Sequence, residues 1–377
     1  MWVPSVWMYS ANMRRDPHGF CMLLGCALGL ISQPSAAVAQ TRPLAQSAVL
    51  YRIARAPEAE RAKTHVLRAE RQLAIGLRAL PNGFRAICER TYELRLAAES
   101  PAVRAGRSRA LQVFWQQGVQ RRDALDAALH EVELARAITP RDADLARLRA
   151  HILVLWEEPT SLERCEVGQR TRAAIQALRE WHELRPELAS STSWAELGAL
   201  FAREGEYVNA SIAYRRALAL ALDARERSTA YAQLAQATML AGDAAAALPY
   251  YQRALASAEP GRTSALLRLG LAVALDRLGE HTRAIEQAVL GVSAVERSLD
   301  WLGPDSISFE PASERFVYRA LAHEALAELM PEARALSLEA AAESYAAFLS
   351  RASAGHLYRN AAEADLRAVV EQLQAPE

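Results

Sequence analysis

Three histidines are each followed directly by a glutamate, which is half of a zinc-protease motif: His130, His182 and His323. The complete motif needs a second histidine one helical turn later, so that two imidazoles and a general base share one helix face. None of the three pairs has that second histidine. The chain also lacks a G-x-S-x-G elbow, a phosphate-cradling glycine loop and a nucleophilic Cys–His signature. We therefore expect no catalytic residue, no cofactor and no metal site.

Two cysteines, Cys88 and Cys165, stand outside the N-terminal segment of the chain. Neither has a neighbour at metal-ligand spacing. In an oxidising compartment they could form a disulfide, and two unpaired thiols are an equal alternative. The sequence leaves both open.

Residues 1–39 have the parts of a secretory signal peptide. Arg14 and Arg15 precede an apolar run over residues 19–31, and an A-x-A site ends at Ala39. A positive flank, a short apolar core and a small-residue site direct a chain across the membrane and are then removed. We expect cleavage after Ala39 and a periplasmic mature chain.

Cys26 raises a second possibility for the same segment. With the three residues before it, it resembles the lipobox at which bacterial lipoproteins are cleaved and acylated. More apolar residues follow Cys26 than precede it, which favours ordinary cleavage over lipid anchoring in the envelope. No other apolar stretch reaches the roughly 18 residues of a spanning helix, so we expect no integral span in the mature chain.

Charge and composition narrow the class of protein. The 44 basic and 44 acidic residues balance and are interspersed, so no stripe suits a phosphate backbone. Nucleic acid is not an expected partner. The chain is 51% hydrophobic and dominated by Ala, Leu, Arg and Glu, which are strong helix formers. An all-α fold is predicted.

A repeat of 37 residues organises the second half of the chain. Gly205, Gly242 and Gly279 recur at this spacing, and an acid follows each. Small and aromatic residues recur at matching offsets around them, which is typical of stacked helical hairpins. The glycine permits the left-handed turn that ends a first helix, and the acid then begins the next helix.

These residues resemble the tetratricopeptide repeat (TPR) family. The match in the first segment runs over Trp194, Leu197, Gly198, Phe201, Gly205, Ala210, Tyr214 and Ala217. The second segment has Tyr231 in the Trp place, and the third is weaker, with Arg268 there and Ala288 for the aromatic. The resemblance covers residues 191–298 and implies a right-handed superhelical solenoid of antiparallel helix hairpins.

The resemblance also implies a protein-binding groove lined by the first helix of each hairpin. The corresponding positions are Thr192, Ala195, Ala199, Ala202, Thr229, Ala232, Gln236, Met239, Leu266, Leu269, Val273 and Asp276. Such a groove is small and mildly apolar, and it lacks the Lys and Asn cluster that binds a C-terminal carboxylate. It suits a helix or extended segment packed by shape.

Outside the clear repeats we expect more helices. Residues 40–190 are interpreted as three degenerate hairpins, with helices at 62–80, 84–98, 108–117, 124–138, 142–156 and 171–184 and a loose link at 157–168. Residues 299–312 form a loop, and 313–377 form a C-terminal hairpin and a polar capping helix.

Taken together, the sequence favours a non-enzymatic TPR scaffold that binds a protein partner in the cell envelope. The alternative is a cell-wall-acting enzyme or carbohydrate-binding helical solenoid, because distant repeats of a superhelix can bring two acids together.

Overall fold

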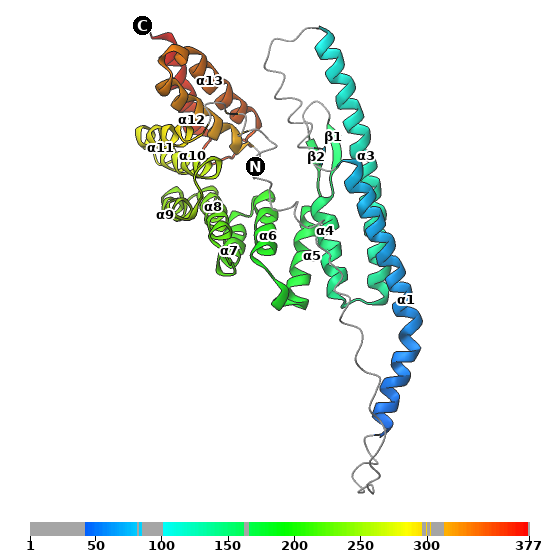
Figure 1. The fold of residues 1–377 in the computed structure, drawn as a ribbon. Coiled ribbons are helices and arrows are strands. Elements are labelled where there is room, and N and C mark those ends of the chain that lie inside the picture. Colours follow the sequence, from blue (N-terminus) through cyan, green and yellow to red (C-terminus); the bar gives the residue numbers. More distant parts are fainter. Residues whose placement is uncertain are drawn as a thin grey trace.

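The computed structural model describes residues 42–80, 83–84, 101–161, 166–295, 299, 302 and 313–375, with only the backbone described at 42–56, 101–108, 161 and 166. These residues are almost entirely helical and form a stack of antiparallel helix pairs (Figure 1). The predicted all-α solenoid is confirmed. None of the described helices is long and apolar enough to span a bilayer.

Several sequence predictions concern residues outside the described ranges. They are the signal peptide at 1–39, the lipid-anchor alternative at Cys26, the pairing of Cys88 with Cys165, the helix at 84–98 beyond Phe84, and most of the loop at 299–312. These stay predictions. Within the loop, Leu302 is fully buried and donates its N–H to the Leu299 carbonyl at 2.8 Å.

Three hairpins form where the 37-residue repeat lies. Their helices are α6 (Ser191–Arg203), α7 (Tyr207–Ala219), α8 (Ala224–Leu240), α9 (Ala244–Ser257), α10 (Arg262–Asp276) and α11 (His281–Ser293). Each helix packs against the one before and the one after it. The hairpins therefore add to one another in a row, as a solenoid requires.

The three repeat glycines close their helices with one and the same turn. Gly205, Gly242 and Gly279 have φ values of 76°, 101° and 78°. The N–H of each glycine bonds three residues back, and the N–H of the following acid bonds five residues back, to Phe201, Thr238 and Leu275. This pair of bonds is the Schellman motif, which satisfies the last carbonyls of a helix. The predicted helix-ending role of the glycines is confirmed.

The acids after the glycines begin the next helices in two ways. Asp243 accepts the N–H of Ala246 at 2.8 Å and caps α9. Glu206 and Glu280 occupy the same place, but neither caps its helix through the side chain. The longer Glu side chain instead turns to a neighbour, as with the amide of Asn209 at 2.7 Å.

Gly242→Val is expected to lower the free energy of unfolding by about 1–2 kcal/mol, because a β-branched residue is strained at positive φ. A Cβ at Gly242 would meet only Leu357 Cδ1, at an ordinary 3.6 Å, so the cost comes from the backbone. Chemical denaturation measures it. Gly355→Val is the matched control, since Gly355 has no positive φ and an added Cβ would meet open space. Equal losses at the two glycines would contradict the turn assignment.

The N-terminal region differs from the three short hairpins that we expected. α1 (Arg42–Ala79) and α3 (Pro101–Ile138) are 38 residues each and pack along one another. They run antiparallel, because His65 contacts Glu131 while Gly76 lies against Ala124. One long hairpin thus takes the place of two short ones (Figure 1).

The expected break between helices at 117 and 124 was wrong, and local packing explains why. No proline lies in residues 118–123, and a single glycine does not end a helix by itself. Gly118 is held between Phe84 and Pro159, where an added Cβ would come within 2.8 Å of Pro159 Cγ. Three residues later, buried Arg121 donates to the carbonyls of Leu80 and Leu155, the latter at 3.0 Å. Tertiary contacts therefore keep α3 continuous.

A further pair, α4 (Ala143–Leu155) and α5 (Thr171–Leu184), lies close to the predicted bounds and packs between α3 and α6. The link between them is more ordered than expected. It forms an antiparallel ribbon of β1 (Glu158–Ser161) and β2 (Glu166–Gly168), with Pro159 opposite Val167. A short 3₁₀ turn, Pro186–Leu188, leads from α5 to α6.

The C-terminal helices are α12 (Glu314–Leu329), α13 (Arg334–Arg351) and α14 (Arg359–Gln374), with a 3₁₀ turn at Pro331–Ala333. α12 packs on α10 and α11, and α14 packs on α13. One hydrophobic core runs from α8 through α14, while α6 shares a second core with α4 and α5. The C-terminal helices thus share one hydrophobic core with the second and third repeats.

Candidate functional site

The groove positions implied by the TPR resemblance lie on α6, α8 and α10, and they divide by exposure. Seven are partly exposed: Thr192, Ala195, Ala199, Thr229, Ala232, Gln236 and Leu266. Five are buried: Ala202, Met239, Leu269, Val273 and Asp276. Six of the seven partly exposed positions belong to the first two repeats. The face is open at α6 and α8, and the chain itself covers it at α10.

The covering contacts show why the third repeat offers little groove. Leu269 Cγ lies 3.7 Å from where a Cβ on Gly291 would stand, so Leu269 faces α11. In the second repeat, Met239 at the end of α8 is also fully buried, and its carbonyl accepts the Tyr358 hydroxyl at 2.7 Å. Leu269, Val273 and Met239 are therefore buried in this structure and cannot contact a partner. The role of the seven remaining positions stays a prediction.

Two side-chain amide atoms on α8 are buried without a hydrogen-bond partner among the described residues. Gln236 Nε2 is buried and makes no hydrogen bond to any described residue, and neither does Oε1 of Gln233 on the same helix. A buried amide without a partner is unfavourable by about 1–3 kcal/mol. Because Gln236 Nε2 itself is buried, this donor is not presented to a partner on the open face.

Two tyrosines on second helices of hairpins pack closely against glycines. A Cβ at Gly198 would lie 2.5 Å from Tyr214 Cε1, and a Cβ at Gly270 would lie 2.4 Å from Tyr251 Cε1. Tyr214 and Tyr251 occupy the same place in successive repeats, at the second helix of each hairpin. The Gly198–Tyr214 contact lies within the first hairpin, and the Gly270–Tyr251 contact lies between the second and third hairpins. The feature that recurs at the repeat period is the turn geometry. These three hairpins are tetratricopeptide-like repeats.

Comparisons with known proteins gave structural matches only. No family model matches the chain, and no curated protein sequence does. The crystal structure of MamA matches at 20% identity and a TM-score of 0.32, over 46% of this chain and 88% of MamA. The C-terminal part of a TPR repeat-containing protein from Cytophaga hutchinsonii matches at 14% identity and 0.39, over 71% and 99%.

The P58(IPK) TPR domain matches at 14% identity and a TM-score of 0.29, over 83% of this chain and 80% of that one. All these TM-scores are low. The assignment of TPR-like repeats to this chain therefore rests on its recurring turns and on the order of its helices.

The three His–Glu pairs of the sequence do not act as pairs. Glu131 bonds His65 Nδ1 at 2.6 Å, and Glu324 bonds His281 and Tyr345. His182 is buried while Glu183 beside it is exposed. On α5 and α6 the His182 ring packs between two tryptophans, with ring centroids 5.2 Å from Trp181 and 4.5 Å from Trp194.

Acid is expected to destabilise the protein through His182 and His323. Burial lowers the pKa of each to about 4 from 6.5. A base with a depressed folded-state pKa contributes stability that is complete above pH 6.5 and is lost as the pH falls towards 4. Urea denaturation at several pH values should therefore show His182→Phe losing less stability over this window than the wild type does. An unchanged pH slope would mean that His182 titrates normally.

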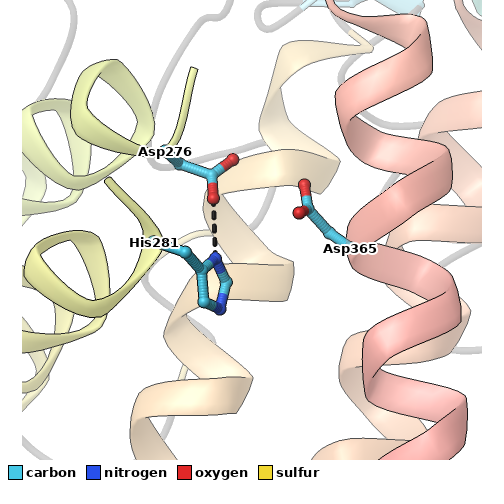
Figure 2. Close-up of side chains that lie close together, drawn as sticks. All are labelled: Asp276, His281 and Asp365. Atoms are coloured by element: carbon cyan, nitrogen blue, oxygen red, sulfur yellow. Dashed lines mark hydrogen bonds and ion pairs between the residues drawn. The ribbon is translucent and has the colours of Figure 1, made fainter. Parts of the chain in front are cut away.

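A histidine and two carboxylates, His281, Asp276 and Asp365, meet where α10, α11 and α14 converge (Figure 2), and Glu324 of α12 joins them. Asp276 ends α10, and its Oδ1 lies 2.8 Å from His281 Nδ1 at the start of α11. Glu324 Oε2 of α12 lies 3.3 Å from His281 Nε2, and the Tyr345 hydroxyl donates to Glu324 Oε1 at 2.8 Å. Asp365 of α14 points at the Asp276–His281 pair.

Burial and charge shift the protonation of these groups. Hydrogen bonds to Asp276 and Glu324 raise the pKa of His281 to about 10. Burial, followed by repulsion from Asp276, raises the pKa of Asp365 to about 7. Sequence reading missed this cluster. Its members are separated along the chain and belong to four helices, so no local spacing marks them.

A buried ion pair lies on the neighbouring residues. Arg277 Nη2 donates to Glu314 Oε2, and the two side chains are 1% and 0% exposed. His356 Nε2 lies 3.1 Å from Glu314 Oε1, and the Arg277 guanidinium lies 4.0 Å from the Tyr358 ring centre. Burial alone would raise the pKa of Glu314, but Arg277 and His356 hold it below its ordinary value. The ends of the repeats and the C-terminal segment are thereby joined.

Proposed function

We propose that this chain is a non-enzymatic scaffold that binds a protein partner in the bacterial cell envelope. The observation that carries the binding role is the face of α6 and α8, where six of the eight groove positions are partly exposed: Thr192, Ala195, Ala199, Thr229, Ala232 and Gln236. Small side chains allow a partner backbone to approach closely.

The cell-envelope location is supported by the sequence of the first 39 residues, with their basic flank, apolar run and A-x-A site. Expression in a bacterium followed by fractionation tests it. The mature protein should appear in the periplasmic fraction with Gln40 as its first residue. Labelling by a fatty acid at Cys26 would support the lipid-anchored form, and retention of the intact chain in the cytoplasm would contradict export.

Partner binding is tested by capturing the tagged protein from envelope extracts and by changing the open face. Ala199→Arg and Ala232→Arg place a long charged side chain on α6 and α8. Each should reduce recovery of a stoichiometric partner at least ten-fold while far-UV circular dichroism stays the same. Ala245→Arg is the matched control, because Ala245 is exposed on α9, the second helix of its hairpin. Leu269 is unsuitable for this test, because it is fully buried.

Two results would count against the scaffold. One is equal recovery of the partner with the two groove variants and with the control. The other is sedimentation of the purified chain with peptidoglycan in the absence of protein, which would favour a carbohydrate-binding solenoid.

A further inference from the structure

The side-chain cluster at the end of the third repeat contains the donors of a metal site. One ligand atom each from Asp276, His281 and Asp365 lie within 4.8 Å of one another. Two carboxylates and an imidazole suit divalent ions of the zinc and manganese class, which accept mixed nitrogen and oxygen ligands. The ligands come from α10, α11 and α14 and converge on one point (Figure 2).

Glu324, which is not itself a proposed ligand, holds the His281 ring in the orientation that a metal-binding imidazole needs. Glu324 Oε2 stands 3.3 Å from His281 Nε2, the nitrogen on the far side of the ring from Asp276. A metal-binding imidazole almost always donates its other N–H to a carboxylate, which fixes the ring and leaves the first nitrogen free for the metal. Glu324 is in turn held by the Tyr345 hydroxyl, and both are nearly completely buried.

Charge gives an independent reason for a cation here. Asp276, Glu324 and Asp365 can carry three negative charges, against one positive charge at most on His281. Asp276 and Glu324 are only 4% and 6% exposed, so water screens little of this imbalance. Excess charge of one sign in such a place is unfavourable unless a counter-ion or a proton neutralises it.

We propose that Asp276, His281 and Asp365 bind one divalent transition-metal ion, such as Zn²⁺, with Glu324 supporting His281 from behind. The ion takes the place of the proton on Nδ1, so that binding releases a proton to the solvent. Asp365 belongs to α14, while the other two ligands belong to the third repeat. The ion therefore links the C-terminal helix to the third repeat. This site is separate from the groove on α6 and α8.

Isothermal titration of the full-length chain with Zn²⁺ tests the proposal. One saturable site should appear, with heat that depends on the buffer because a proton is released, and EDTA should reverse it. Zn²⁺ should also raise the melting temperature. Mg²⁺ should do neither, because it prefers oxygen ligands and keeps its waters.

Variants place the site at this cluster. Asp365→Asn and His281→Gln each remove one ligand and should abolish the binding, and Glu324→Gln should weaken it by about 10–100-fold. Glu371→Gln is the control, because Glu371 is an exposed carboxylate on the same helix. Any zinc bound by thiols elsewhere would persist in all four variants and can be subtracted.

The near-isosteric Asp365→Asn variant should keep wild-type helicity without metal, so that lost binding can be separated from unfolding. Absence of a saturable site in the wild type would overturn the proposal, as would unchanged affinity in Asp365→Asn and His281→Gln. The cluster would then be an internal ion-pair network only. Neither result would bear on partner capture through α6 and α8.

Discussion

Glu314→Ala should lower the free energy of unfolding by about 3–5 kcal/mol, the largest effect that we expect of any single change. The substitution leaves the Arg277 guanidinium charged in a place where its side chain is 1% exposed. Two of its nitrogens, Nε and Nη1, already lack hydrogen-bond partners among the described residues, so no nearby group replaces the carboxylate. Urea denaturation followed by circular dichroism measures the loss.

A double variant separates the unpaired charge from lost packing. Arg277→Met with Glu314→Leu removes both charges and fills much of the same volume, so it should recover most of the stability lost in Glu314→Ala. Tyr358 packs on Arg277, and Met keeps an apolar contact with that ring. A double variant as unstable as Glu314→Ala would show that the charges themselves stabilise the fold.

Gly270→Leu should lower the free energy of unfolding by about 3 kcal/mol, because a well-packed site cannot accept extra methylenes. Any Cβ here meets the Tyr251 ring at 2.4 Å. The ring cannot swing aside at low cost, since it is 2% exposed and its hydroxyl lies 3.1 Å from that of Tyr318. Thermal or chemical denaturation measures the effect.

A double-mutant cycle checks the contact between α9 and α10. Tyr251→Ala is destabilising alone, because it opens a cavity, but it makes room for the new side chain at position 270. The loss in Gly270→Leu with Tyr251→Ala should therefore be clearly smaller than the sum of the two single losses. Additive losses would mean that the glycine is needed for a reason other than its approach to Tyr251.

Much of the repeat region could be predicted, because its determinants are local. A helix can end at Gly205 or Gly242 with the Schellman turn because glycine tolerates positive φ there, and this requirement is visible in one residue type. The close packing of Tyr214 against Gly198 is likewise indicated by the small residue seven places before the turn. The 37-residue period then implies stacking, since each hairpin has an apolar face that only a neighbour can bury.

The N-terminal region shows where local signals mislead. Gly118 marks a plausible end of a helix, yet α3 continues through it because Phe84, Pro159 and Arg121 make contacts from elsewhere in the chain. The link at 157–168 was expected to be irregular, but its described residues 158–161 and 166–168 form a two-stranded ribbon. In both places the deciding partners are distant in sequence, so propensity alone does not reveal them.

The candidate sites divide in the same way. The positions of the groove follow from the repeat pattern, but which of them remain open depends on what covers them. Tyr358 reaches the Met239 carbonyl across 119 residues, and no spacing rule anticipates such a contact. The approach of Asp365 to Asp276 and His281 depends equally on where α14 packs.

The sequence by itself therefore determined the helical class, the repeat and the turns, because glycine conformation and helical periodicity act within a few residues. Only the tertiary structure decided that α1 and α3 form one long hairpin, that the third repeat is covered, and that a histidine meets three carboxylates. These features depend on side chains from separate helices meeting in space, and their energies arise from burial and charge at that meeting point.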